Sequence, residues 1–270
     1  MTQDSATLSP VRPTRRVVTR TAVWTVPVIA AATTAPAYAA SPCNLRVGQV
    51  LDWDGSAVAY TKTSATEAYA VLDPDAAGPI PGLRLDVKAS YVGNMVAGTE
   101  GGDTSQTMTR QAAVGGLNVS GLGLMQATTS SAPNTPAGTT RGYGDRGTYT
   151  FTFSRAVSNL VFTITDIDSS TDDFRDALII SGGYVVESQA PGITAITNNN
   201  NQPVNWFQGA DANLPQDDTA GSGGNLRIKF AGPISTFSIT YWNRQTAYDQ
   251  NIDTNQRIFV SDMTFDYRPC

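Results

Sequence analysis

The chain has 270 residues, with 18 lysines and arginines against 23 aspartates and glutamates, two cysteines and no histidine. The absence of histidine excludes Ser-His and Cys-His nucleophile systems and histidine-built zinc sites. The acidic excess argues against nucleic acid or an anionic membrane as a partner, because both require a basic surface.

Residues 1–39 have the pattern of a cleaved export signal. A basic stretch, TRRVVTR, precedes a weakly apolar stretch, residues 21–34, and Ala37-Tyr38-Ala39 has the small-x-small form of a cleavage site. We therefore expect cleavage after Ala39. The apolar stretch is too short to remain as a transmembrane helix, and no membrane span is expected in the mature chain.

The paired arginines, Arg15 and Arg16, resemble the twin-arginine export motif. The long basic region and the modest apolarity that follows suit this route better than the general secretory route. A general secretory signal with incidental arginines is the alternative. In both cases the protein is expected to be secreted and extracellular.

The mature chain, residues 40–270, has 231 residues, enough for one domain with its own core. Residues 1–39 carry four arginines and one aspartate, so 14 basic and 22 acidic residues remain, a net charge of −8. This charge is compatible with a soluble secreted protein and with cation binding.

The two cysteines, Cys43 and Cys270, stand at the two ends of the mature chain. In an exported protein, two cysteines predict a disulfide. This bond would require the first and last strands to lie side by side. Two free thiols, or a bond between two chains, are the alternatives.

The first half of the mature chain contains short runs of alternating apolar and polar residues, which predict half-buried strands. Between these runs, residues 93–109 read as a polar loop, and residues 130–147, with two prolines and four glycines, read as a long surface connection. The expected strands are residues 45–53, 58–61, 68–72, 83–89 and, interrupted by glycines, 111–128.

The central stretch, residues 148–183, has the clearest strand pattern. Tyr149, Phe151 and Phe153 share one face, and further along the chain an apolar set at residues 160, 162 and 164 does the same. The short link of residues 154–159 predicts that the two runs form a hairpin.

The second half continues in short strands separated by Gly-, Pro- and Asn-rich turns, and residues 211–224 read as a flexible polar loop. No stretch outside the signal sustains helical periodicity over three turns. This pattern predicts an all-β fold, a single antiparallel β-sandwich of jelly-roll type over residues 40–270. The expected strands are residues 176–181, 184–189, 193–197, 226–230, 237–241 and 257–267, the consecutive ones joined as hairpins.

The phrases FSRAVSNLVFTITDID and IFVSDMTF resemble sequences of secreted bacterial jelly-roll domains of uncharacterised function. The signal, TRRVVTRTAVWTVPVIAAATTAPAYAASP, resembles those of actinobacterial exported proteins. The resemblance implies an extracellular β-sandwich and brings no catalytic residues with it.

Five aspartates crowd the segment after the central strands. Carboxylate oxygens close together are the ligands that Ca²⁺ prefers, so the cluster predicts a structural calcium site. The spacing does not fit an EF-hand, because Thr171 stands where that loop has its glycine. The alternative is a solvated acidic loop in which Asp166 caps the strand end. The candidate ligands are Asp166, Asp168, Asp172, Asp173 and Asp176.

Aromatic side chains near the predicted loops are candidates for stacking on sugar rings. The candidates are Trp206, Trp242 and Tyr143. Tyr241 continues the inward face of its strand, so Trp242 is expected to point outward or into the following loop. The alternative is that these rings cover the ends of the core.

No catalytic constellation is recognisable, and we expect no enzymatic activity. The favoured hypothesis is an exported binding module that contacts an extracellular glycan or another cell-surface component. The alternatives are a structural exoprotein without a small ligand, and a hydrolase that uses a pair of carboxylates about 5–9 Å apart. The position of Trp206 and Trp242 would discriminate among the three.

Export by the twin-arginine route makes a direct prediction. Replacing both Arg15 and Arg16 by lysine should block secretion, because that route reads the arginine pair itself rather than positive charge. Immunoblots of medium and cells measure the effect, with a single lysine substitution at Arg20 as the control. Undiminished secretion of the double variant would assign the chain to the general secretory route.

Overall fold

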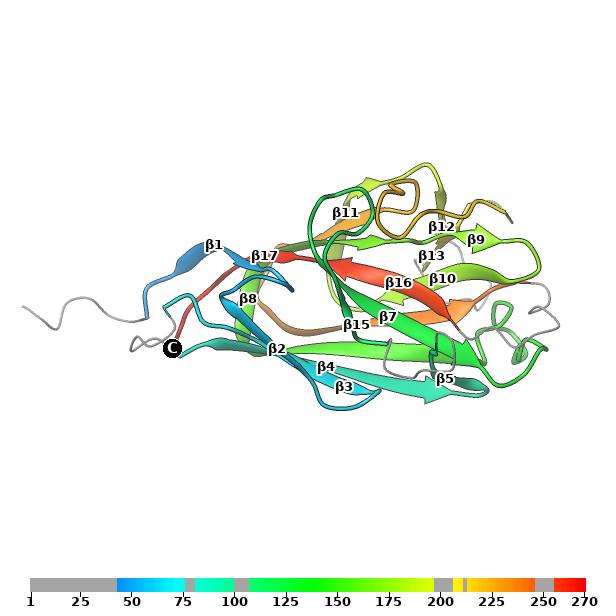
Figure 1. Cartoon of the computed structure of the whole chain (residues 1–270), viewed down its shortest axis with the longest axis horizontal. Helices are drawn as coiled ribbons and strands as arrows, with labels where there is room; N and C mark the ends of the chain where they lie inside the picture. Colours follow the sequence, from blue (N-terminus) through cyan, green and yellow to red (C-terminus); the bar gives the residue numbers. More distant parts are fainter. Residues whose placement is uncertain (1–42, 76–80, 100–106, 197–205, 211–212, 246–254) are drawn as a thin grey trace, which may run out of the picture. The chain divides into compact units, whose positions relative to one another are not determined.

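The computed structural model describes residues 43–75, 81–99, 107–196, 206–210, 213–245 and 255–270. The predicted export signal lies outside these residues. All described secondary structure is β, and the strands form one large antiparallel sheet that folds over on itself as a sandwich (Figure 1). The predicted fold class is therefore confirmed. Among the described residues, no helix is long and apolar enough to cross a membrane.

The first layer consists of eight antiparallel strands whose neighbours are hydrogen-bonded. Only the first half of β8 belongs to it. In spatial order the strands are β2 (Val58–Lys62), β3 (Glu67–Leu72), β4 (Leu83–Val92), β8 (Arg146–Thr165), β15 (Ile234–Asn243), β10 (Phe174–Ile180), β13 (Trp206–Gly209) and β12 (Ile193–Ile196).

The second layer forms around the other half of β8. One neighbour there is β14, and the other is the last part of the chain, in which β16 and β17 follow one another along β8. The strands of this layer are β11 (Tyr184–Gln189), β14 (Leu226–Phe230), β16 (Gln256–Ser261), β17 (Met263–Tyr267), β1 (Arg46–Leu51), β7 (Gly121–Thr128), β5 (Met95–Ala97) and β6 (Arg110–Gln111).

The predicted hairpin at residues 154–159 is wrong. The segment is the middle of the single 20-residue strand β8, which leaves one layer and enters the other. Before the change Phe151 lies opposite Phe237 of β15, and after it Phe162 lies opposite Ile228 of β14. Asn159 adopts a left-handed conformation, with φ of 51°, at the point where the partners change. Because the bent strand pairs with β15 before the bend and with β14 after it, both of its apolar runs are buried without a hairpin between them.

Two further pairs of consecutive strands are also not hairpins. The strands β10 and β11 were expected to pair across Gly182, but β10 pairs with β13 and β15, whereas β11 pairs with β14. Likewise β14 and β15 pair with different halves of β8. The glycine turns therefore carry the chain from one layer to the other, as in sandwiches with crossing connections.

Stacked aromatic rings fill the space between the layers. Phe237 on β15 lies 4.7 Å, centroid to centroid, from Phe151 in its own layer and 5.1 Å from Phe162 in the other. Phe230 on β14 completes the group, 5.4 Å from Phe237. All four are buried. Ring pairs at these distances contribute about 0.5–1.5 kcal/mol each beyond their buried area.

The two ends of the mature chain lie side by side. Strand β1 pairs antiparallel with β17, next to the C-terminus in Figure 1, and a disulfide joins Cys43 to Cys270 with 5.1 Å between their Cα atoms. The predicted bond is confirmed. The Asp266 carboxylate adds a hydrogen bond from Gly48 N at 2.7 Å.

Loss of the disulfide should lower stability strongly, since the bond closes a loop with a sequence separation of 227 residues. We expect the double variant Cys43→Ser, Cys270→Ser to lose about 2–5 kcal/mol in unfolding free energy. Urea unfolding of the mature protein measures this, and added reductant should then have no further effect on the variant. Equal midpoints for the two proteins would show that strand pairing alone holds the ends.

Candidate functional site

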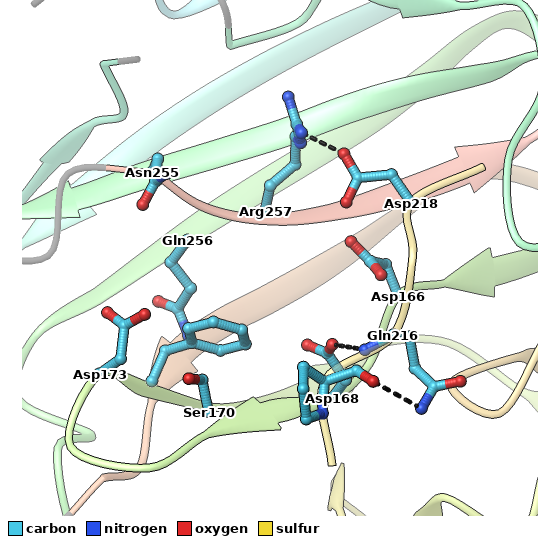
Figure 2. A pocket seen from close by; sticks show the side chains of 11 residues that line it. Asp166, Asp168, Ser170, Asp173, Gln216, Asp218, Asn255, Gln256 and Arg257 are labelled. Atoms are coloured by element: carbon cyan, nitrogen blue, oxygen red, sulfur yellow. Dashed lines mark hydrogen bonds and ion pairs between the residues drawn. The ribbon is translucent and has the colours of Figure 1, made fainter. Parts of the chain in front are cut away.

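A polar pocket of about 280 Å³ opens where β8 ends, and we call it the acidic pocket (Figure 2). Its walls come from the end of β8, the start of β10, the start of β16 and the connection before β14. Its lining residues are Asp166, Asp168, Ser170, Asp173, Phe174, Pro215, Gln216, Asp218, Asn255, Gln256 and Arg257.

The chain folds back on itself directly after β8. Asp166 has a left-handed backbone, with φ of 68°, which few residues other than glycine, asparagine and aspartate adopt easily. The following residues, β9 (Ser169–Ser170), pair with Phe174 and Arg175 at the start of β10. A second left-handed residue, Asp172, forms the tip of this short hairpin. The five aspartates are thus spread over the strand end and the two arms of a hairpin.

Asp176 lies behind the pocket and has all the hydrogen bonds it needs. Its Oδ1 accepts from the Tyr241 hydroxyl at 2.6 Å and from Gln256 Nε2 at 2.8 Å, and its Oδ2 accepts from the backbone N–H of Asp168 at 3.1 Å. The Gln256 side chain is held in turn by Gln126 at 2.9 Å. This buried network fixes the floor of the pocket.

The connection before β14 holds Asp168 and supplies Asp218, which is held by Arg257 of β16. The backbone N–H of Gln216 donates to Asp168 Oδ2 at 2.5 Å, and Asp218 forms an ion pair with Arg257. The connection is fixed to the body of the domain because Gly115 N–H donates to the Asp218 carbonyl at 2.8 Å.

Asp166 is the least satisfied group in the pocket. Its side chain lies between the Asp218–Arg257 ion pair and the Asp168–Gln216 contact (Figure 2), and the residue is only 6 % exposed. Its Oδ1 is buried and receives no hydrogen bond from the described residues. An unsatisfied buried oxygen costs about 1–3 kcal/mol, so the absence of a partner calls for an explanation.

Burial and crowding raise the pKa values of these carboxyls. Burial first, and then the charges of Asp168, Asp218 and Asp176, raise the pKa of Asp166 to about 10. Burial raises the pKa of Asp168 to about 7, although the hydrogen bond from Gln216 opposes the change. Burial and the charge of Asp168 raise the pKa of Asp176 well above its ordinary value. The surroundings of these carboxyls therefore favour their protonated forms.

The five predicted calcium ligands do not form one set. Asp166, Asp168 and Asp173 line the pocket, whereas Asp176 lies behind it and Asp172 is exposed at the hairpin tip. Within the described ranges, no three acidic, histidine or cysteine side chains are grouped so as to hold a metal ion.

The expectation that Trp242 is available to a ligand is wrong. Trp242 does point away from the main core, but it is 0 % exposed because a second cluster covers it. The ring of Tyr143 packs edge-on against the Trp242 ring, with 5.2 Å between centroids. The Arg146 guanidinium lies over the same Tyr143 ring, 4.5 Å from its centroid. Tyr143, from the long connection before β8, thus serves as a cover. Trp206 begins β13, and its side chain lies outside the described residues.

Several lining residues were not identified from the sequence. Asp218 and Gln216 belong to a stretch read as a flexible polar loop, with no periodicity to place it. Arg257 begins a predicted strand and Gln256 directly precedes it, and alternation along a strand gives the face of a residue but not the loop that lies beside it. The residues missed are Ser170, Phe174, Pro215, Gln216, Asp218, Asn255, Gln256 and Arg257.

Comparisons with protein-family models, with curated proteins and with solved structures found no match for this chain. The site is therefore interpreted from its own geometry and chemistry.

The raised pKa values predict how stability depends on pH in a metal-free buffer. Between about pH 4 and pH 10 the folded state keeps a proton on Asp166 that the unfolded chain has lost, so rising pH destabilises the folded state. Asp168 contributes in the same direction up to about pH 7. One group contributes at most about 1.4 kcal/mol per pH unit.

Asp166→Asn should therefore raise the melting temperature at pH 8 by a few degrees relative to the unmodified protein, and the difference should shrink toward pH 4. Calorimetry from pH 4 to pH 9 measures both curves. Asp172→Asn is the matched control, because it changes an exposed aspartate of the same hairpin. If the difference in melting temperature, Asp166→Asn minus unmodified protein, were smaller at pH 8 than at pH 5, the raised pKa of Asp166 would be contradicted.

Proposed function

We propose that the protein is exported, through the twin-arginine route, and acts outside the cell as a binding module. The signal-like residues 1–39 support export, and the disulfide is compatible with an oxidising extracellular setting. The net charge of −8 for the mature chain supports a partner that is neither nucleic acid nor an anionic membrane.

The acidic pocket is the proposed ligand site. The observation that carries this proposal is an open polar pocket whose partly exposed rim, at Asp173 and Phe174, adjoins buried carboxylates. Concave sites that combine a few polar groups with apolar surface are the usual places for small ligands.

The rim of the pocket favours a ligand rich in hydroxyl groups, such as one sugar unit of a glycan. Asp173 supplies an acceptor, the Asn255 amide supplies both a donor and an acceptor, and the ring of Phe174 supplies apolar surface beside them. A sugar hydroxyl both donates and accepts, and hydrogen bonds to carboxylates are among the stronger ones. The volume of about 280 Å³ is at the lower end for small-molecule sites and suits one small unit.

This proposal keeps the carbohydrate hypothesis but moves it to another place. The aromatic residues first considered are not its basis, because Trp242 is covered by Tyr143. Instead the proposed ligand contacts come from the start of β10, the start of β16 and the connection before β14, which meet at the end of β8.

Glycan binding can be tested by calorimetric titration of the mature protein with monosaccharides and short oligosaccharides, selected from a glycan array. Asp173→Asn and Phe174→Ala should each weaken binding about tenfold or more, since each removes a rim contact while leaving the buried network intact. Asp172→Asn, one residue away and exposed, should bind normally.

Equal affinities for Asp173→Asn and Asp172→Asn would place the glycan elsewhere on the protein. Chromatography of the titrated mixture also tests whether the protein hydrolyses the glycan. Shortened glycans would indicate a hydrolase that uses a pair of carboxylates instead of a binding module. Binding to no glycan at all would contradict the proposal.

A further inference from the structure

The inner wall of the acidic pocket differs from its rim. Asp166 and Asp168 are buried there, whereas Asp173 and Phe174 are partly exposed and Asn255 is exposed. The rim contacts proposed for a hydroxyl ligand come from residues other than Asp166 and Asp168. The inner wall therefore needs its own explanation.

We propose that the inner wall binds one Ca²⁺ between the carboxylates of Asp166 and Asp218, with neutral oxygens and water completing the coordination. This inference deepens the proposed function, because it concerns the same pocket and names what occupies its inner part.

The contact between two carboxyl groups is the first argument. Asp166 is close enough to Asp218 for a hydrogen bond between the two side chains, and Figure 2 shows Asp166 facing toward Asp218. Two ionised carboxylates at this separation repel each other unless a proton or a cation lies between them. A shared proton would relieve the repulsion between one oxygen of each group, and Asp166 Oδ1 has no hydrogen-bond partner among the described residues. A cation can satisfy that oxygen as well.

The charge balance is the second argument. Three carboxylates, those of Asp166, Asp168 and Asp218, meet here against the single guanidinium of Arg257. The formal net charge of this group is −2 when all are ionised, which one divalent cation cancels. A neutral ligand leaves this charge uncompensated.

The donor set selects the cation. The side-chain atoms of the pocket that can ligate a metal are oxygens of carboxylates, amides and a hydroxyl, and the chain has no histidine, so a hard cation is favoured over zinc or copper. Ca²⁺ tolerates irregular geometry and accepts carboxylates, amide oxygens and water together, whereas Mg²⁺ requires near-octahedral geometry. A site with two carboxylates is also consistent with the absence of a three-residue metal cluster in the described part of the chain.

The proposed ligands differ from the five aspartates that follow β8 in the sequence. Asp176 is engaged by three hydrogen-bond donors, and Asp172 is exposed outside the pocket. Asp218 comes instead from the connection before β14. Ca²⁺ would therefore join the end of β8 to that connection.

The test titrates the chelator-treated mature protein with CaCl₂ alone, by calorimetry, and follows thermal unfolding in CaCl₂ and in chelator. We expect one Ca²⁺ per chain, and a rise in melting temperature of about 5–10 °C at one hundred times Kd. Asp166→Asn and Asp218→Asn should each weaken Ca²⁺ binding at least tenfold. Asparagine accepts the left-handed backbone at residue 166, and melting in chelator checks that each variant folds.

Asp172→Asn is the matched control and should bind Ca²⁺ normally. An equal loss in this variant would overturn the inference in favour of the hairpin tip, and identical melting curves of the unmodified protein in CaCl₂ and chelator would overturn it altogether. MgCl₂ binding as strong as CaCl₂ binding would overturn the choice of cation. Glycan titrations in chelator and in CaCl₂ keep the two proposals apart, since glycan binding without any Ca²⁺ binding contradicts this inference alone.

Discussion

The fold depends on one strand that belongs to both layers. The first half of β8 pairs with β4 and β15, and its second half pairs with β14, β16 and β17. Because its inward residues contribute aromatic rings on both sides of the bend, the strand fixes how the two layers face each other. The last part of the chain then pairs with β8, and β1 pairs with the last strand, so the disulfide closes an arrangement that β8 has already set.

The same strand brings charge into the interior. Of the aspartates that follow its end, Asp166, Asp168 and Asp176 are buried, whereas Asp172 is exposed. The fold compensates for one of them completely, because Asp176 receives three hydrogen bonds from fixed groups. It does not compensate for Asp166, whose Oδ1 has no donor among the described residues. Carboxyls left in this state lower the stability of the fold, and groups of this kind cluster at functional sites. The aromatic core and the disulfide stabilise the fold and offset this destabilisation.

The contrast between Trp242 and Asp166 shows how covering segments decide what is exposed. Both lie outside the main aromatic core. The long connection before β8 places Tyr143 over Trp242 and closes that face, whereas the connection before β14 lies beside Asp166 and leaves a pocket. Neither connection has a periodic pattern, so neither position follows from the alternation along the strands.

The sequence by itself determined the all-β class, most strand positions and the pairing of the two cysteines. Alternation of apolar and polar residues is a local property, and a chain with two cysteines has only one intramolecular disulfide to form. Only the tertiary structure decided that residues 154–159 continue a strand, that β10 and β11 lie in different layers, and that Asp218 meets Asp166. These outcomes depend on which strands become neighbours and where a connection comes to rest. Those are contacts between residues far apart in the chain, and no short stretch of sequence encodes them.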